Sequence, residues 1–285
     1  LGQGAVEAAA DRRRKPGVTL TGAITETTTE QRRAALEAIA AEVRVCTRCR
    51  LSQQRTKAVP GEGHPDTEVV FVGEGPGQTE DQQGRPFVGR AGELLVKWLA
   101  SIGWRRQEVF ITNIVKCRPP GNRDPEPDEI AACAPYLQRQ LEVLDPAVVA
   151  TLGRFSMGHF RPGERITQIH GTHAPAPAET GTRDAVAFAL FHPAAALRST
   201  EVERQSYEDI ARLPKVLEAA RAARTPHLAG TSEAAPTPEP RRAPDAAPAA
   251  EATATPQTAA ERVTILDSND ASHTDDGPTL FEAEP

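Results

Sequence analysis

Residues 69–77, with the sequence VVFVGEGPG, join a continuous apolar run to a glycine-rich segment. A short apolar run that stops at glycines is typical of a strand buried on both faces and followed by a tight loop. The chain beyond this stretch alternates further apolar runs with helical patterns. Such alternation predicts an α/β fold with a parallel sheet between helices.

The other elements follow from hydrophobic periodicity. Strands are expected at residues 109–115, 148–152 and 185–191, and helices at residues 31–45, 91–102, 127–144 and 202–223, the last interrupted near Pro214. This order predicts a three-layer α/β/α sandwich with a central, mainly parallel four-stranded sheet. Ligands bind at the carboxyl ends of such strands, so the loops after Val72, Ile111 and Phe191 are expected to converge.

The ends of the chain differ in composition from its middle. Of the 285 residues, only 4% are aromatic, and the formal net charge is −6. Residues 226–285 hold 14 Ala, 9 Pro and 3 Arg against 11 Asp and Glu, a net charge of −8, which leaves +2 for the rest. This composition, and the Ala-, Arg- and Thr-rich residues 1–28, predict disordered termini around one ordered domain at residues 29–225.

Several classes of protein are disfavoured. No stretch approaches the roughly 20 apolar residues that cross a bilayer, and residues 1–20 lack the apolar segment of a secretory signal. Four cysteines in 285 residues do not make a disulfide scaffold of the small secreted kind. We expect a monomeric cytoplasmic protein with no membrane partner, whose thiols hold a metal or do chemistry.

The cysteines give the first chemical signal. Cys46 and Cys49 form a CxxC motif, Cys117 follows a strand, and Cys133 lies within the next helix. All four can meet at one side of the sheet, and four thiolates suit either zinc or a 4Fe-4S cluster. Spacing alone does not choose between these metals. The alternatives are two core cysteines beside an isolated CxxC turn, or a thioredoxin-like role, although this CxxC follows a helix.

Three segments together carry a family resemblance: GEGPGQTEDQQGRPFVGRAGELL at residues 73–95, ITNIVKCRPPGNRDPEPDEIAAC at residues 111–133 and HPAAALR at residues 192–198. They resemble the iron-sulfur, family 4 branch of the uracil-DNA glycosylase superfamily, over roughly residues 46–217. The resemblance implies a three-layer α/β/α fold and a 4Fe-4S cluster on all four cysteines. It also implies a bacterial DNA-repair hydrolase, active at the nucleoid, that flips uracil out of single- or double-stranded DNA, releases the base and leaves an abasic site.

The resemblance assigns roles around the flipped base. Phe87 matches the stacking residue, and the Asn113 amide offers an acceptor and a donor for the uracil edge at O4 and N3. His192 is the candidate donor to uracil O2. Gly75 and Gly77 would let the backbone approach the base. Without the resemblance, each side chain also has a structural explanation: a core Phe, an Asn that caps a turn and a structural His.

The group that orients the attacking water is open. A better-known branch of the superfamily has an Asp where this chain has Gly75. The resemblance marks Glu74 and Glu80 as functional, with Asn122 as a candidate to support Glu80. Glu80 either orients water or fills the space of the thymine methyl group. Alternatively, both carboxylates stabilise the N-terminus of a nearby helix.

DNA contacts are expected from local basic residues, because the first 225 residues carry little net charge. The candidates around the crevice are Arg85, Arg90, Lys116, Arg118, Arg123 and Arg198. Leu197 and Arg198 lie where the superfamily's wedge enters the base stack. Residues 278–281 resemble the Leu-Phe peptides that dock bacterial repair proteins on the sliding clamp, through Leu280 and Phe281, although Gly277 replaces the usual Gln.

Other functions explain the sequence less fully than monofunctional uracil excision does. One relative traps its product covalently through a His after the third cysteine, but residues 119–124 contain no His. A metal-binding or electron-transfer module would explain the cysteines but leave Phe87, Asn113 and His192 without a role. A non-catalytic uracil-DNA-binding iron-sulfur protein of the same superfamily remains a further alternative. Because hydrolysis has no redox demand, the cluster is expected to be a scaffold for residues 117–133.

Overall fold

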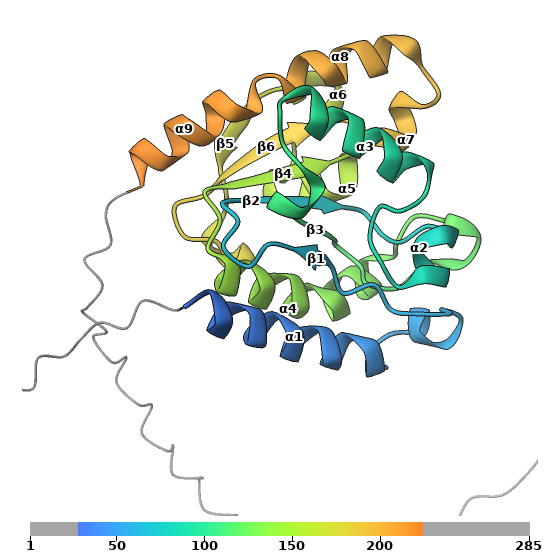
Figure 1. Cartoon of the computed structure of the whole chain (residues 1–285). Coiled ribbons are helices and arrows are strands. Elements are labelled where there is room, and N and C mark those ends of the chain that lie inside the picture. Colours follow the sequence, from blue (N-terminus) through green and yellow to red (C-terminus); the bar gives the residue numbers. More distant parts are fainter. Residues whose placement is uncertain (1–27, 225–285) are drawn as a thin grey trace, which may run out of the picture. The chain divides into compact units, whose positions relative to one another are not determined.

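The computed structural model of the chain describes residues 28–224 (Figure 1). The predicted disordered segments lie outside this range, apart from Thr28, and so does the candidate clamp peptide with Leu280 and Phe281. Between residues 28 and 224, no helix has the length and apolar character needed to cross a membrane.

A six-stranded sheet lies at the centre, in the order β1-β3-β2-β4-β6-β5. The four predicted strands pair in parallel: β3 (Phe110–Asn113), β2 (Val69–Gly73), β4 (Val148–Leu152) and β6 (Val186–Leu190). Two short antiparallel strands, β1 (Glu62–Gly63) and β5 (His173–Pro175), extend its edges. These two were not predicted, because two or three residues are too few to show a hydrophobic period.

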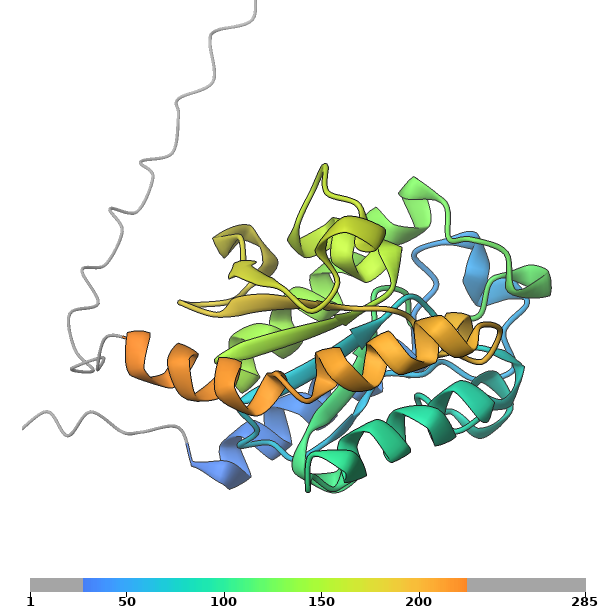
Figure 2. The ribbon, with the colours of Figure 1, turned by 90° about the horizontal axis from the view of Figure 1, so that it is seen from above.

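Helices cover both faces of the sheet, which confirms the predicted three layers (Figures 1 and 2). One face packs against α1 (Thr29–Val45), α4 (Pro127–Leu144) and α5 (Arg154–Phe160). The other packs against α3 (Arg90–Ser101), α8 (Thr200–Ile210) and α9 (Leu213–Ala223). The break between α8 and α9 precedes Pro214, which therefore lies in a first helical turn, where its missing N–H has no partner to lose.

The connections contain shorter elements. These are α2 (Gln78–Gln83), α6 (Ile166–Ile169) and α7 (Pro193–Ala196), with the 3-10 turns η1 (Arg50–Gln53), η2 (Arg106–Glu108), η3 (Pro120–Asn122) and η4 (Ala178–Thr180). Several of them follow directly on the strands and shape the loops at the carboxyl edge of the sheet.

The position of strand β2 between the two helical layers explains why residues 69–72 are all apolar. Val69 and Phe71 belong to the core beneath α3, α8 and α9, whereas Val70 and Val72 belong to the core beneath α1 and α4. Because successive side chains point to opposite faces, burial on both faces requires an unbroken apolar sequence.

The register of the strands aligns the loops that follow them. Gly73 at the end of β2 pairs with Asn113 at the end of β3, and Leu152 at the end of β4 pairs with Leu190 at the end of β6. Parallel pairing therefore brings four strand ends, and the loops after them, to one edge of the molecule.

Candidate functional site

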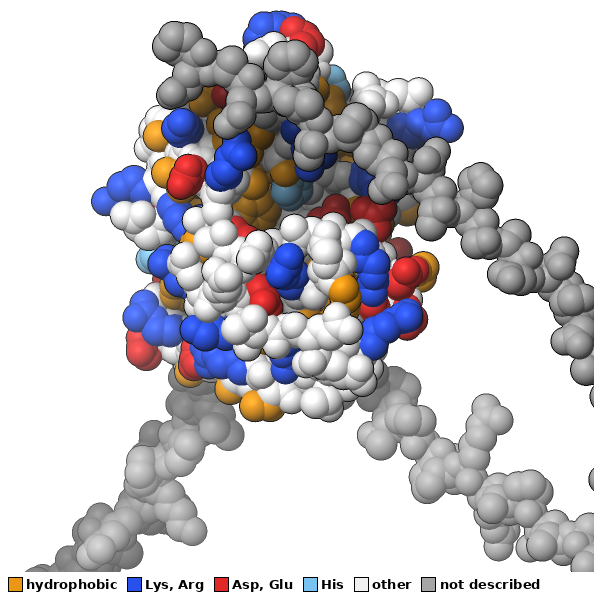
Figure 3. All heavy atoms as spheres, turned by 90° about the vertical axis from the view of Figure 1, so that its right-hand side faces the viewer, with side chains coloured by type: hydrophobic (Ala, Val, Ile, Leu, Met, Phe, Trp, Pro, Cys, Tyr) orange, Lys and Arg blue, Asp and Glu red, His pale blue; other side chains and the backbone are white. Residues whose placement is uncertain are grey.

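A crevice of about 490 Å³ opens at this carboxyl edge. Figure 3 views the molecule from that side, where hydrophobic, acidic and His side chains gather in a hollow between basic ones. The crevice brings together most of the residues singled out from the sequence, namely Glu74, Gly75, Gly77, Glu80, Phe87, Asn113, Asn122, Arg123, His192 and Arg198. The predicted convergence of the loops is confirmed.

Phe87 and His192 face each other within the crevice. Their ring centroids are 5.8 Å apart and their planes are tilted by 34°. Phe87 is only 7% exposed and has a positive φ of 49°, which is uncommon for a residue with a large side chain. The surrounding structure must therefore hold this backbone conformation in place.

Glu80 supplies part of that restraint. Its Oε1 accepts hydrogen bonds from the backbone N–H groups of Val88, at 2.9 Å, and Gly89, at 2.8 Å. Gly89 is the N-cap residue of α3, so the carboxylate lies at the start of that helix, as the structural alternative predicts. The backbone carbonyl of Phe87 is fixed from the other side, since it accepts a hydrogen bond from Arg106 at 2.9 Å.

Asn122 does not hydrogen-bond to Glu80. Its Oδ1 accepts a hydrogen bond from Arg118 Nε at 2.6 Å, and its φ of 56° lies in the left-handed region that Asn tolerates. Asn122 therefore orients Arg118 beside the crevice and gives Glu80 no direct support.

His192 caps a short helix through one ring nitrogen. Its Nδ1 accepts a hydrogen bond from the N–H of Ala194, at 3.1 Å, which caps α7. In a neutral ring this assignment leaves the proton on Nε2. Burial, together with the charge of Arg198, lowers the pKa of His192 to about 4, while the charge of Glu80 opposes the shift. At neutral pH the imidazole is therefore an uncharged donor.

Asn113 holds an unused acceptor. The residue is 1% exposed, and its Oδ1 has no hydrogen-bond partner within residues 28–224. A buried unpaired acceptor costs about 1–3 kcal/mol, so this atom needs a hydrogen-bond partner that the described residues do not supply. Gly73 makes room for it, because a Cβ there would lie 2.4 Å from Asn113 Oδ1 and 2.6 Å from Phe87 Cζ.

Glu74 is a partly buried carboxylate of the crevice. Burial raises its pKa, the charge of Asp124 raises it further, and that of Arg154 lowers it. Asp124 and Arg154 form an exposed ion pair, and both line the crevice. This pair was not predicted from the sequence, although Arg154 follows the end of β4 and therefore lies at the carboxyl edge.

Gly153 is another residue that the sequence analysis missed. It has a φ of 87°, and a Cβ added to it would lie 2.8 Å from the Cβ of His192. A glycine is thus needed both for the turn and for the close approach of His192.

Two of the predicted DNA contacts do not lie on the crevice. Lys116 was predicted to contact DNA, and this is wrong, because its side chain is buried and 1% exposed. Arg85 is exposed, but it pairs with Glu62 at 2.8 Å and lines a separate hollow beside β1. Neither side chain is placed to neutralise a phosphate at the crevice.

The remaining basic candidates lie near it. Arg198 lines the crevice, and the neighbouring Leu197 is 41% exposed, as expected of an apolar wedge. Arg123 also lines the crevice but makes a bidentate ion pair with the buried Glu129. Arg90 is exposed at the start of α3.

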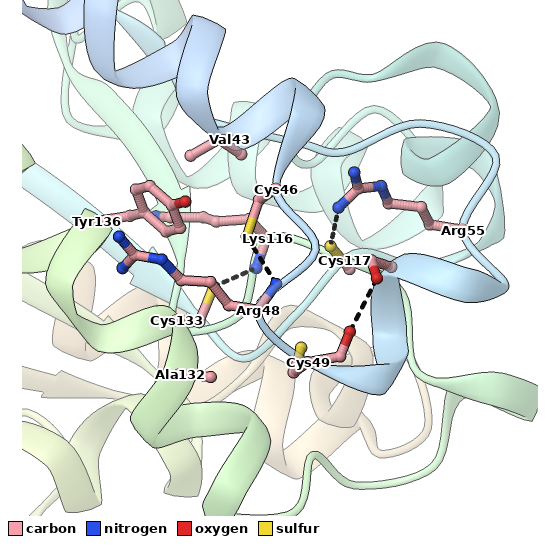
Figure 4. Close-up of a pocket in the computed structure, with 11 residues that line it drawn as sticks. Val43, Cys46, Arg48, Cys49, Arg55, Lys116, Cys117, Ala132, Cys133 and Tyr136 are labelled. Carbon is pink, nitrogen blue, oxygen red and sulfur yellow. Dashed lines mark hydrogen bonds between the residues drawn. The ribbon is translucent and has the colours of Figure 1, made fainter.

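A second cavity is lined by all four cysteines (Figure 4). Cys117 and Cys133 are buried, and Cys46 and Cys49 are partly exposed. They come from the end of α1, the loop after β3 and the middle of α4, as the spacing predicts. Within residues 28–224, no three or more His, Cys, Asp or Glu side chains are arranged around a point suitable for a single metal ion.

Three sulfur atoms of this cavity accept N–H hydrogen bonds. The donors are Arg55 Nη1 to Cys117 at 3.0 Å, the Lys116 backbone to Cys133 at 3.2 Å and the Arg48 backbone to Cys46 at 3.5 Å. Such donors stabilise negative charge on sulfur.

Comparison with known proteins agrees with this geometry. The model of the uracil DNA glycosylase superfamily matches residues 60–212. The chain is 46% identical over 182 residues to a type-4 uracil-DNA glycosylase of Sulfurisphaera tokodaii, over 62% of this chain and 83% of that protein. Identity to the protein of the same name is 43% over 190 residues in Saccharolobus solfataricus, over 65% and 87% of the two chains. In Thermotoga maritima it is 45% over 179 residues, over 61% and 91%.

Proposed function

The chain belongs to the uracil-DNA glycosylase superfamily, and on that premise we propose how its own residues carry out uracil excision. It is a DNA-repair hydrolase that cleaves the N-glycosidic bond of uracil in DNA. The reaction releases the free base and leaves an abasic site. The base must first be flipped out of the stack into a pocket, which is the role we assign to the crevice.

The observation that carries this assignment is the unpaired Oδ1 of Asn113, buried beside the ring of Phe87. Uracil presents an N3–H donor and an O4 acceptor on one edge, and the amide of Asn113 complements both. Cytosine reverses the polarity of these groups, so it would leave buried polar atoms unpaired. Stacking on Phe87 would hold the plane of the base while Asn113 reads its edge.

His192 would act at the opposite edge of the base. As the glycosidic bond lengthens, negative charge builds on the uracil, and an Nε2–H donor near O2 would stabilise it. A neutral imidazole suits this role, because a protonated imidazole would place a full positive charge in a partly buried pocket. The cap to Ala194 fixes the ring, so no reorganisation is needed during the reaction.

We assign orientation of the attacking water to Glu74. Its carboxylate lines the crevice, and its pKa is shifted by burial and by neighbouring charges, with no contribution from a hydrogen bond. Glu80, in contrast, holds two backbone N–H groups of the Phe87 loop. We therefore propose that Glu80 positions the stacking ring and that Glu74 faces the water.

For the four cysteines we propose a 4Fe-4S cluster in preference to zinc. The four sulfurs line a common cavity, and N–H donors point at three of them. Both features suit a cluster of several atoms with charge spread over its sulfurs. The cluster would pin the loop that carries Asn122 beside the DNA. Purified protein should contain iron and acid-labile sulfide; zinc alone would overturn this proposal.

The proposed partners beyond DNA concern residues outside the described range. We propose that the peptide with Leu280 and Phe281 docks on the bacterial sliding clamp. We also propose that the enzyme acts in the cytoplasm, at the nucleoid, as a monomer. A clamp pull-down with the full chain and with residues 276–285 removed tests the first point. Sedimentation tests the second.

The test of the catalytic proposal is a time course with labelled oligonucleotides that contain uracil, thymine or hypoxanthine. We expect release of free uracil and an alkali-labile abasic site, with thymine left intact. A covalent protein–DNA adduct would support the trapping alternative. Binding without release would support a non-catalytic protein.

A further inference from the structure

Lys116 is a buried cation with only uncharged partners. Its Nζ donates to Thr112 Oγ1 at 2.6 Å, to Gln140 Oε1 at 2.7 Å and to the carbonyl of Asn113 at 2.9 Å. The hydroxyl of Thr112 donates its own proton to the carbonyl of Pro60, at 3.0 Å. Three acceptors at these distances match the three N–H donors of an ammonium group.

A buried charge without a counter-charge is costly, and proteins pair such groups. Among residues 28–224, Lys116 forms no ion pair with a carboxylate, and its side chain is 1% exposed, so solvent cannot compensate. A negatively charged group elsewhere near this side chain would offset that cost.

The cysteine cavity supplies that group. Lys116 lines it together with all four cysteines, and its own backbone N–H points at Cys133 Sγ, at 3.2 Å (Figure 4). Of the other basic side chains of this cavity, Arg48 is exposed, and Arg55 is partly exposed and donates directly to Cys117 Sγ. Lys116 is the one that acts through a low-dielectric interior, where a charge has its largest effect.

We propose that Lys116 is the built-in counter-charge of the cluster that the four cysteines hold. The inference rests on the proposed 4Fe-4S cluster, whose thiolate ligands give it a net negative charge that grows on reduction. A fixed buried cation beside it would stabilise the bound cluster and favour its reduced form. The same ammonium also holds the carbonyl of Asn113, so one side chain spans the cluster and the strand that reads uracil.

The first test removes the charge. In Lys116→Met holoprotein we expect a more negative reduction potential, measured by spectroelectrochemical titration, and several-fold faster loss of the cluster's visible absorption in a chelator. Lys116→Arg keeps the charge and should stay close to the original protein in both measurements. Lys97→Met, which removes an exposed lysine of α3, is the matched control and should change neither.

A second variant leaves Lys116 in place. Gln140→Glu would put a carboxylate 2.7 Å from Nζ and neutralise the ammonium inside the protein. We expect the potential to shift in the same direction as in Lys116→Met, and the cluster to be lost faster. Because Gln140→Glu keeps the lysine side chain and pairs it with a carboxylate, this variant is expected to fold. It therefore tests the inference if Lys116→Met gives no folded holoprotein.

The outcomes separate two failures. If the original protein holds no iron and no sulfide, the proposed cluster is wrong. If it holds the cluster but Lys116→Met and Gln140→Glu leave potential and cluster loss unchanged, the cluster stands and the counter-charge is wrong. Equal effects of Lys116→Arg and Lys116→Met would also overturn the inference, because shape and not charge would then be responsible.

Discussion

The rings of Phe87 and His192, which are 105 positions apart in the chain, lie 5.8 Å apart between centroids and are tilted by 34°. Phe87 belongs to the loop between α2 and α3, and His192 to the loop after β6. The unpaired Oδ1 of Asn113 lies beside Phe87 in the same crevice. In the proposed mode of binding, a planar base would stack on Phe87, present its polar edge to Asn113 and accept from His192, and each contact can be tested separately.

Replacing His192 separates its two roles. His192→Ala removes the Nε2 donor and the cap of α7, so we expect excision to fall on the order of a hundredfold and stability to fall by about 1 kcal/mol. His192→Asn keeps an acceptor for the Ala194 N–H and should recover stability but not rate. Single-turnover kinetics and thermal melts measure the two effects. Full excision by His192→Ala would remove this residue from the mechanism.

The lowered pKa of His192 also predicts a pH dependence of stability. In the unfolded chain the imidazole takes up a proton near pH 6.5, whereas in the folded protein it does so only near pH 4. As the pH falls through this window the unfolded state binds more protons, so the free energy of unfolding drops by up to about 1.4 kcal/mol per pH unit. Denaturant titrations between pH 7 and pH 4 should show a shallower decline for His192→Asn. Parallel curves would contradict the shift.

Substitutions of Glu80 distinguish positioning from water activation. Gln retains an oxygen that accepts from Val88 and Gly89, so Glu80→Gln should remain close to the original excision rate if the carboxylate only holds the Phe87 loop. Glu80→Ala should lose activity, because the backbone N–H groups of Val88 and Gly89 lose their acceptor and the Phe87 loop loses a restraint. If Glu80→Gln is as defective as Glu80→Ala, the negative charge itself is required, and Glu80 becomes a candidate to orient water.

The unpaired Oδ1 of Asn113 is expected to lower the free energy of unfolding while it provides selectivity for uracil. Asn113→Ala removes the unpaired acceptor, so the free energy of unfolding should stay the same or rise, while uracil excision falls on the order of a hundredfold or more. Chemical denaturation and a uracil-release assay measure the two quantities on one preparation. An excision rate like that of the original protein, or a clear loss of stability, would show that Asn113 serves the fold.

The Asp124–Arg154 ion pair is expected to weaken DNA binding. Asp124→Asn removes a negative charge from the crevice and frees Arg154 for a phosphate, so DNA affinity at low salt should rise several-fold. Arg154→Ala should weaken binding and reduce the slope of log K against log salt concentration by about 1. The control is Glu42→Gln, which breaks the Glu42–Arg139 ion pair between α1 and α4. Unchanged affinity in both crevice variants would exclude this role.

The fold was largely predictable because its strands are buried on both faces. The apolar runs at 69–72 and 148–152 correspond to β2 and β4, and the helical pattern at 127–144 to α4. Helix α2 was missed, since its sequence QTEDQQ has no apolar period and it is set by contacts of Glu80 and Asp81 with other segments.

The site was predictable where it depends on strand ends, and not where it depends on distant partners. Phe87, Asn113 and His192 follow from topology and family resemblance. The burial of Lys116 does not, because a lysine after a strand is usually exposed, and here Thr112 and Gln140 enclose it. Likewise, nothing in the local sequence shows that Glu80 holds Val88 and Gly89.

Gly73 has no side chain, yet Asn113 and Phe87, the residues proposed to read the uracil edge and to stack on the base, both need the space that it leaves open. A mutation there would imitate the loss of two functional groups at once while deleting neither. In a genetic screen, a repair-deficient allele at this codon would therefore identify a residue that takes no direct part in the reaction.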